Sequence, residues 1–331
     1  MNTKIFNNKT ILITGGTGSF GTECTKYILK NFKVKKMIVY SRDENKQYLM
    51  EKEINHPKLR FFLGDVRDLE RLNMAMREVD YVIHAAALKH VPIAEYNPIE
   101  CIKTNVNGAQ NIITASLQNK VKKVLALSTD KATNPINLYG ASKLAAEKLF
   151  LAANALVGKK DLTFSVVRYG NVINSRGSVI PHFKELIQNK TSYFPITDRN
   201  MTRFFMKLED SVKFVLRCFS EMRIGEVFVP KLYSFKITDL AKILSPGTKH
   251  KFVGIRPGEK LDEFLISLEE NRNILEFKSH YVIFKDLYDK KKFKRVFKNK
   301  GNDVSKDFYY SSNNNQQFLN LKQIKKKFPK L

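Results

Sequence analysis

The sequence predicts an α/β fold built on a doubly wound parallel sheet, with a smaller C-terminal lobe interleaved with it. Three observations predict it: six short apolar segments, helical stretches between them, and a glycine-rich turn directly after the first segment. The segments are continuously apolar rather than alternating, as expected when helices cover both faces of a sheet. The predicted strands are residues 10–14, 37–40, 60–63, 81–84, 124–128 and 164–168.

Composition limits the protein class. The chain has 331 residues, of which 43% are hydrophobic and 27% charged, so it is long and apolar enough to bury a core and is not disordered. The formal charge of +26 makes phosphates, nucleic acid and anionic lipid candidate partners without choosing among them. Cys24, Cys101 and Cys218 are far apart, which fits no disulfide framework or zinc cluster. We expect buried thiols, a reducing compartment and no metal site.

The chain carries no predicted membrane segment. A bilayer-spanning helix needs about 18 or more apolar residues in a row, and the sequence has no such run. Residues 1–9 are polar and lack the apolar stretch of a signal peptide. We therefore expect a soluble, cytoplasmic protein.

Two interleaved units are expected along the chain. Beyond Gly170 the strand–helix rhythm gives way to segments punctuated by glycine and proline, while residues 210–222 and 226–229 still indicate a helix and a strand of the sheet. We assign residues 1–172 plus about 208–232 to a Rossmann-type dinucleotide-binding domain. Residues 173–207 plus 233–331 form the expected substrate lobe, and its segment 285–300 and its last turn are rich in lysine.

Gly15, Gly18 and Gly21 form the pattern G-x-x-G-x-x-G where the first strand meets a helix. Such glycines permit a tight turn, close approach of backbone amides to a pyrophosphate, and close packing of helix on strand. The pattern alone is weak, and an ordinary glycine turn is the alternative. Its place behind an N-terminal strand that opens a series of βα units favours a bound dinucleotide.

The end of the second strand favours NADP over NAD. Asp43 lies where an acidic residue would bind a ribose 2′-hydroxyl, but Ser41 and Arg42 directly precede it. A hydroxyl and a guanidinium suit a 2′-phosphate. The predicted cofactor-binding residues are Gly15, Thr17, Gly18, Ser19, Phe20, Gly21, Ser41, Arg42, Asp43, Lys46, Asp65, Val66, Ala85, Ala86, Tyr139, Lys143 and Val172.

Tyr139 and Lys143 stand four residues apart in a helical stretch, so their side chains share one helix face. A tyrosine of pKa about 10 is a poor base, but an adjacent ammonium and a positively charged nicotinamide stabilise its phenolate. The pair follows a strand that ends in Ser128 and Thr129. This order of strand, hydroxyl residues, tyrosine and lysine predicts an oxidoreductive site.

The sequence carries many motifs that together resemble those of a known family. The segments TGGTGSFG, YSRDE, GDVRD, HAAALKHVP, STDKATNPINLYGASK, RYGNV, SRGSVIPHF, TRF and RPGEK cover most of the chain to about residue 267. They resemble the extended short-chain dehydrogenases/reductases, and more narrowly the nucleotide-sugar 4,6-dehydratases that act on UDP-N-acetylglucosamine. The Asp130–Lys131 pair is typical of that narrower group, whereas relatives acting on other nucleotide sugars carry acidic pairs there.

Tyr139 distinguishes between two groups of these dehydratases. The long, membrane-anchored dehydratases that retain configuration at carbon 5 typically have methionine at this position and add N-terminal transmembrane helices. The sequence is thus most similar to the short, soluble, inverting enzymes of the PseB-like group, which begin pseudaminic acid biosynthesis.

The resemblance implies a lyase mechanism. Tyr139, supported by Lys143 and a hydroxyl of Ser128 or Thr129, would take the proton of the sugar 4-hydroxyl while hydride passes from carbon 4 to NADP. Lys131 would then remove the carbon 5 proton, if burial and nearby cations lower its pKa, and protonated Asp130 would donate to the departing 6-hydroxyl. Hydride return to carbon 6 and protonation of carbon 5 from the opposite face give the inverted 4-keto-6-deoxy sugar.

Binding of a UDP-sugar requires cations and hydrogen-bond donors. Family positions point to Asn171, Arg203, Arg256 and Glu259 around the nucleotide diphosphate, and to Lys89 near the sugar. Surface ion pairs are the alternative for these residues. Thr129 completes the expected substrate set.

Three other readings remain open. A UDP-sugar 4-epimerase of the same fold needs the glycine turn, Tyr139 and Lys143 but not the Asp130–Lys131 pair. A retaining 4,6-dehydratase differs only in product configuration. A cofactor sensor or nucleic-acid-binding protein is the non-enzyme alternative, although no nucleic-acid motif accompanies the lysines. The family also implies a homo-oligomer, either a dimer or a hexamer.

Overall fold

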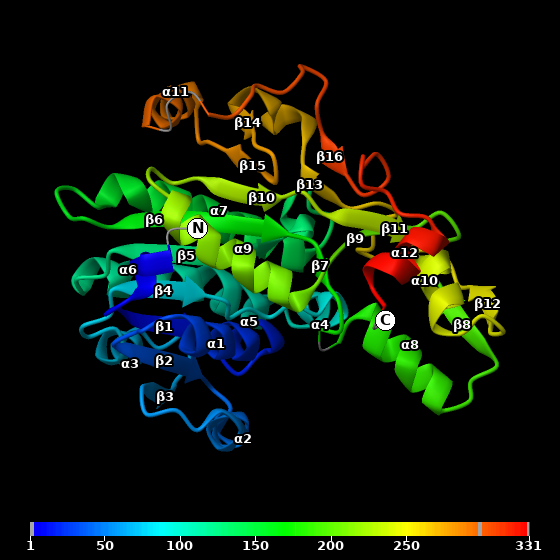
Figure 1. Ribbon diagram of the computed structural model, residues 1–331, viewed down its shortest axis with the longest axis horizontal. Helices are drawn as coiled ribbons and strands as arrows, with labels where there is room; N and C mark the ends of the chain where they lie inside the picture. Colours follow the sequence, from blue (N-terminus) through cyan, green and yellow to red (C-terminus); the bar gives the residue numbers. More distant parts are fainter. Residues whose placement is uncertain (1–2, 176, 297–299, 330) are drawn as a thin grey trace.

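The computed structural model describes residues 3–175, 177–296, 300–329 and 331. Within these residues the chain forms one large sheet, whose strands lie one above another in Figure 1, with a smaller lobe at one end of it. The large sheet has nine strands in the order β14-β15-β10-β6-β5-β4-β1-β2-β3. Their bounds are β1 (Thr10–Thr14), β2 (Lys36–Ser41), β3 (Leu59–Leu63), β4 (Tyr81–His84), β5 (Lys123–Thr129), β6 (Thr163–Tyr169), β10 (Val227–Pro230), β14 (Ile274–Glu276) and β15 (His280–Ile283).

The predicted doubly wound fold is confirmed. All six predicted strands form, within one residue of the expected ends, and they pair in parallel from β3 through to β10. From the centre of the sheet, β1, β2 and β3 follow one another in one direction, and β4, β5 and β6 follow one another in the other. Ligands of open α/β sheets bind at such a change of direction, beyond the carboxyl ends of the strands. Every residue of β1 is buried, because helices lie on both faces of this central strand.

Two apolar cores separate the sheet from the helices on its two faces. On one face Leu12 and Val124 pack with residues of α3, α6 and α7. On the other, Ile11 and Ile13 pack with residues of α1 and α9, the helices seen in front of the sheet in Figure 1. The helices of this unit are α1 (Ser19–Asn31), α2 (Glu44–Ile54), α3 (Leu69–Ala75), α4 (Val91–Tyr96), α5 (Pro98–Ile102), α6 (Gly108–Gln118), α7 (Leu138–Ala153) and α9 (Leu208–Glu221).

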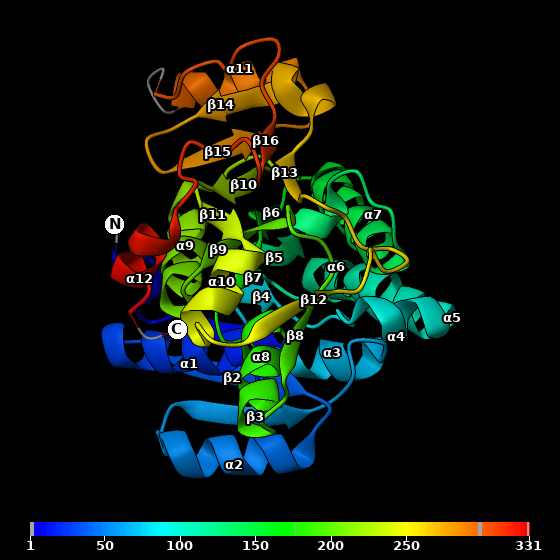
Figure 2. The same cartoon turned by 90° about the vertical axis from the view of Figure 1, so that its right-hand side faces the viewer.

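The smaller lobe has a core of its own. Phe205 and Phe235 stack with ring centroids 4.0 Å apart, and Phe183 and Phe194 stack beside them. Figure 2 shows this lobe at the end of the large sheet, facing the viewer. Its elements are β7 (Asn171–Val172), α8 (Val179–Gln188), β8 (Tyr193–Ile196), β9 (Thr202–Met206), β11 (Tyr233–Lys236), α10 (Ile237–Leu244), β12 (Lys249–Phe252), β13 (Phe264–Ile266), β16 (Tyr310–Ser311) and α12 (Leu321–Lys327).

One segment departs from the expected division of the chain. Residues 233–331 are expected in the substrate lobe, yet β14 and β15 extend the large sheet and α11 (Leu287–Val296) lies beside them (Figure 1). The reason is antiparallel pairing of β15 with β10, which buries Leu275 and Val282 in the core of the large sheet. Two strands of the expected substrate lobe thus belong to the large sheet, and the division of the chain into functional units stays a prediction.

Among the residues that the structure describes, no helix is both long and apolar enough to span a bilayer. Cys24, Cys101 and Cys218 are all buried free thiols.

Candidate active site

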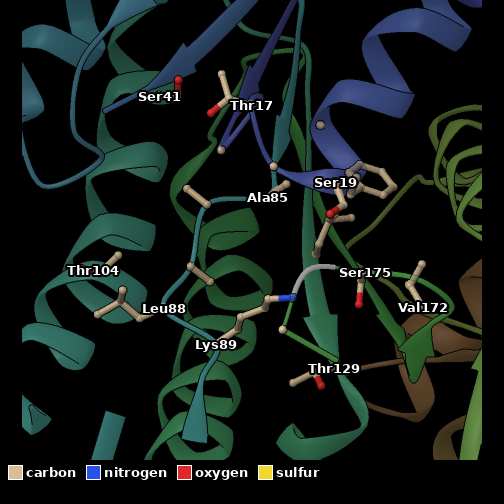
Figure 3. Close-up of a pocket in the computed structure, with 18 of the residues that line it drawn as sticks. Thr17, Ser19, Ser41, Ala85, Leu88, Lys89, Thr104, Thr129, Val172 and Ser175 are labelled. Carbon is tan, nitrogen blue, oxygen red and sulfur yellow. The ribbon is translucent and has the colours of Figure 1, made fainter. Parts of the chain in front are cut away.

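A cavity of about 1030 Å³ lies at the carboxyl ends of the parallel strands. Its walls come from the turns after β1, β2, β3 and β4, from the end of β5, from α7, and from the segment after β6. Every predicted cofactor-binding residue lines it. Figure 3 shows the turn of Thr17 and Ser19 at one end, Thr129 at the other, and the Lys89 side chain pointing in between them.

The glycine turn is shaped for close approach. Gly15 has φ +63°, and a Cβ there would lie 2.9 Å from backbone atoms of Ala86. A Cβ at Gly21 would lie 2.5 Å from the Cα of Gly16, so the first turn of α1 packs directly on the glycine turn that precedes it. Gly18 caps the N-terminus of α1, which faces the cavity. A pyrophosphate fits here, since amides and the helix N-terminus favour negative charge.

At the end of β2, the carboxylates are paired with cationic side chains. The Asp43 carboxylate caps α2 by accepting from the Lys46 amide at 2.9 Å, and it is ion-paired with the Lys46 ammonium at 2.5 Å. Ser41 accepts from Gln47 at 3.0 Å, and the half-exposed Arg42 guanidinium lies 3.4 Å from Asp65. All of these except Gln47 line the cavity.

Tyr139 and Lys143 lie on the buried face of α7, as their spacing predicts. Asn137 begins the helix by accepting from the Gly140 amide at 2.8 Å. A Cβ at Gly140 would lie 2.1 Å from the Lys131 carbonyl oxygen. The missing side chain therefore lets α7 pack against the short 3₁₀ helix η3 (Asp130–Ala132), and this brings Lys131 to the same cavity as Tyr139.

Burial is the largest influence on the pKa values of Tyr139 and Lys143. It raises the pKa of Tyr139 to about 12, although the Lys131 ammonium and a hydrogen bond with Thr129 act to lower it. Burial lowers the pKa of Lys143 to about 8, opposed by the Glu147 carboxylate, and the Lys143 ammonium donates to the Leu127 carbonyl at 2.6 Å. The cation that favours a Tyr139 phenolate in this structure is thus Lys131.

Lys131 sits between two buried carboxylates. Its Nζ lies 3.0 Å from Asp130 Oδ1 and 3.1 Å from Glu263 Oε1. Burial acts to lower the pKa of Lys131, but these two carboxylates outweigh it and raise the pKa above its ordinary value. The expectation that burial and nearby cations lower the pKa is therefore wrong for this structure, because the nearest charges are anions.

The predicted catalytic and substrate residues do not all reach the cavity. Thr129, Lys131, Tyr139, Lys143, Lys89 and Asn171 line it. Asp130 is fully buried, is not among the described lining residues, and contacts Lys131 directly.

Three predicted substrate residues, Arg203, Arg256 and Glu259, are not among the described residues that line the cavity, and their part in substrate binding stays a prediction. Buried Arg203 donates to the carbonyls of residues 202, 260 and 261, so its guanidinium is held by the backbone. Arg256 is exposed and bonds Glu259 at 2.9 Å. Glu259 also pairs with Arg203 at 3.7 Å.

Sequence reasoning missed several residues of the site. Glu263 is the most consequential of them: it is not among the described residues that line the cavity, but it contacts both Lys131 and Arg203. Nothing in its local pattern separates it from the neighbouring acids Glu259 and Asp262. In the cavity lining itself the missed residues include Leu88, Thr104, Ser175, Gly177 and Ser178, which stand in loops or on a helix without a diagnostic spacing.

Comparison with known proteins places the chain in a family. The family model described as polysaccharide biosynthesis protein matches residues 11–285. A Campylobacter jejuni protein named UDP-N-acetylglucosamine 4,6-dehydratase (inverting) is 55% identical, with 97% of each chain covered. A Rickettsia akari protein named UDP-glucose 4-epimerase is 44% identical, with 97% of this chain and 95% of the other covered.

A solved structure agrees over nearly the whole length. The X-ray structure of Pen from Bacillus thuringiensis is 33% identical and covers 98% of this chain and 99% of its own, with a TM-score of 0.89. The chain therefore belongs to the polysaccharide biosynthesis protein family of extended short-chain dehydrogenases/reductases, the family that includes the inverting UDP-N-acetylglucosamine 4,6-dehydratases.

Proposed function

We propose that the protein is an NADP-dependent UDP-N-acetylglucosamine 4,6-dehydratase that inverts carbon 5 and gives a UDP-2-acetamido-2,6-dideoxy-hexos-4-ulose. The observation that carries this proposal is the placement of Lys131, in contact with Asp130, on the same cavity as Tyr139. An amine, a carboxyl group and a phenol at one point supply the base and acid that elimination of water requires. The 55% identity to the Campylobacter jejuni dehydratase supports the substrate.

NADP rather than NAD is the proposed cofactor. The Asp43 carboxylate caps α2 and is paired with Lys46, so a cation stands beside the one carboxylate that could accept from a ribose 2′-hydroxyl. Ser41, Arg42 and Lys46 line the same part of the cavity and together offer a hydroxyl and two cations to a 2′-phosphate. When bound beside Tyr139, the nicotinamide supplies the acceptor and donor of hydride.

The chain's own residues perform the proton transfers. Tyr139 removes the proton of the sugar 4-hydroxyl, helped by Lys131 and by its hydrogen bond with Thr129. A ketone at carbon 4 then acidifies the carbon 5 proton. Lys131 is cationic in this structure, so it must lose a proton before it acts as the base. Moving one proton across the 3.0 Å from Lys131 Nζ to Asp130 Oδ1 gives an amine and a carboxylic acid together.

That single transfer prepares both groups. The Lys131 amine removes the carbon 5 proton, and Asp130 donates its proton to the departing 6-hydroxyl, which leaves as water. We further propose that Lys89 and Asn171, on the cavity wall near this point, bind the sugar and the diphosphate. Arg203, Arg256 and Glu259 act in the proposal only as the ion-paired edge of the substrate lobe.

Mass spectrometry of the nucleotide sugar tests the proposal. Purified protein incubated with NADP and UDP-N-acetylglucosamine, without added reductant, is expected to give a product lighter by one water. Lys131→Ala should abolish that product, while a matched change of the exposed Lys291 to Ala should not. Proton NMR of the same sample determines the configuration at carbon 5. An unchanged substrate mass with wild-type protein would refute dehydration.

A 4-epimerase is the second candidate, favoured by the Rickettsia akari relative at 44% identity. An epimerase returns hydride to carbon 4 and leaves the 6-hydroxyl in place, so product and substrate have the same mass. The Asp130–Lys131 contact has no task in that reaction. Altered configuration at unchanged mass would support this candidate.

Assembly and location are proposed on separate grounds. Apolar side chains of α4 and α5, among them Ile93, Tyr96 and Ile99, are more than half exposed, which supports a homo-oligomer. Light scattering of the purified protein tests it. The three buried free thiols support a cytoplasmic location.

A further inference from the structure

Glu263 stands opposite the proposed base yet belongs to a different part of the chain. It directly precedes β13 in the substrate lobe, whereas Lys131 lies in η3 beside the large sheet. Its side chain is only 3% exposed, and Oε1 lies 3.1 Å from Lys131 Nζ. We propose that Glu263 is a positioning residue that acts through Lys131, holding its ammonium at the cavity and setting the pH at which it becomes a base. This inference rests on the proposed function.

The backbone of Glu263 is anchored on both sides. Its amide donates to the Ser312 hydroxyl at 3.0 Å, and its carbonyl accepts from the Ser312 amide at 2.8 Å. The carboxylate is therefore held by the fold of the lobe rather than by Lys131 itself. Asp130, the other carboxylate on Lys131, is its sequence neighbour, and neither Asp130 nor Glu263 is among the described residues that line the cavity. Glu263 supplies the second contact that fixes the direction of the Lys131 side chain.

The charges around Lys131 come from every element packed against it. Asp130 and Glu263 are the anions, Arg203 and Lys260 are the cations, and Tyr139 is the neutral phenol. Arg203 Nε lies 3.7 Å from Glu263 Oε1, so Glu263 bridges two cations. Removing its charge leaves Lys131 facing two cations with a single carboxylate, which makes the ammonium less favourable.

Two buried oxygens mark the cluster as built for proton movement. Asp130 Oδ2 and Glu263 Oε2 have no hydrogen-bond partner among the described residues. An unpaired buried carboxylate oxygen is costly, and such groups concentrate where protons or ligands are exchanged. When Lys131 accepts the carbon 5 proton, the C–H bond breaks, an N–H bond forms and the electron pair enters the enolate. The new ammonium is then stabilised by Glu263 as well as by Asp130.

Glu263→Gln tests the inference because it removes the charge and keeps the shape. We expect the pH below which turnover is lost to fall by about one to three units, the usual effect of removing one adjacent carboxylate. Glu263→Asp keeps the charge and should retain the wild-type pH profile with lower turnover. Glu269→Gln removes one charge from an exposed position of the same lobe and should change neither. A purely structural role would lower turnover equally at every pH.

A second readout does not need the reaction. Competitive acylation of amines, followed by mass spectrometry of the peptide carrying Lys131, reports the pH at which this residue becomes reactive. That pH should be lower in Glu263→Gln than in wild type and unchanged in Glu269→Gln. An unchanged Lys131 titration in Glu263→Gln would overturn the inference, whether or not the wild-type protein dehydrates the sugar. Absence of dehydrated product from wild type refutes the proposed function alone.

Discussion

Replacing Gly140 by alanine probes the contact that places Lys131 beside Tyr139. The added Cβ would lie 2.1 Å from the Lys131 carbonyl oxygen and 3.1 Å from Pro135 Cβ. A carbon and an oxygen in contact are normally about 3.3 Å or more apart, so η3 and α7 must separate by about 1 Å. Helix α7 is held by its Asn137 cap, whereas η3 is three residues long, so η3 is expected to move.

The change is expected to reduce both the rate of catalysis and the stability of the fold. A displacement of about 1 Å in an active site costs roughly 100-fold in rate, equivalent to about 2.7 kcal/mol in the barrier. Overpacking of this kind lowers the free energy of unfolding by about 1–3 kcal/mol. We expect NADP affinity to be unchanged, because the glycine turn of Gly15 and Gly21 is a separate element.

The assay is the rate of dehydrated product formation, with urea unfolding and NADP titration on the same preparations. Gly247→Ala is the matched control, since its added Cβ would meet no described atom within 4 Å. Turnover by Gly140→Ala within about threefold of wild type would refute the role given to this packing.

Four further outcomes are expected. Arg42→Ala should weaken NADP binding about tenfold or more relative to NAD in fluorescence titrations, since one charge-assisted hydrogen bond contributes about 1.5–3 kcal/mol; equal weakening of both cofactors contradicts the 2′-phosphate assignment. Tyr139→Phe should slow product formation by about 10²–10⁴-fold, the usual contribution of a general base, with NADP binding retained. Arg168→Met leaves the buried carboxylate of Glu147, which lies 2.7 Å from the Arg168 guanidinium, without that cation. The free energy of unfolding in urea should fall by about 3–5 kcal/mol, and adding Glu147→Leu should recover much of it. Burial, helped by the Lys143 ammonium, lowers the pKa of His84 to about 3, so between pH 6.5 and 3 the unfolded chain binds more protons than the native one. The free energy of unfolding therefore falls as the pH drops through this window. In denaturation series at several pH values, the stability of His84→Gln should fall less steeply than that of the wild type.

Local patterns were enough to predict the sheet and the cofactor end of the cavity. The strand at Thr10–Thr14 and the glycines after it are defined by residues that are neighbours in sequence. Parallel strands deliver their carboxyl ends to one edge of a sheet, so the turns that follow them must meet there. The spacing of Tyr139 and Lys143 on one helix face is equally local.

The charge environment of the site was decided by tertiary structure. Sequence places Lys131 beside Asp130, but the second carboxylate, Glu263, arrives from the other lobe through the packing of β13 against η3. Asp130 and Glu263 together outweigh burial and raise the pKa of Lys131, against the expected direction. In the same way the backbone carbonyls around Arg203 hold a guanidinium that family position alone directs toward a ligand.

The amino-acid sequence by itself therefore determined the fold class, the glycine turn and the placement of Tyr139 and Lys143 on one helix face, because each depends on periodicity or spacing over a few residues. Only the tertiary structure decided which ions surround Lys131, which predicted residues reach the cavity, and that β14 and β15 join the large sheet. These depend on contacts between segments far apart in the chain, where Coulomb energy varies with distance and burial rather than with sequence separation.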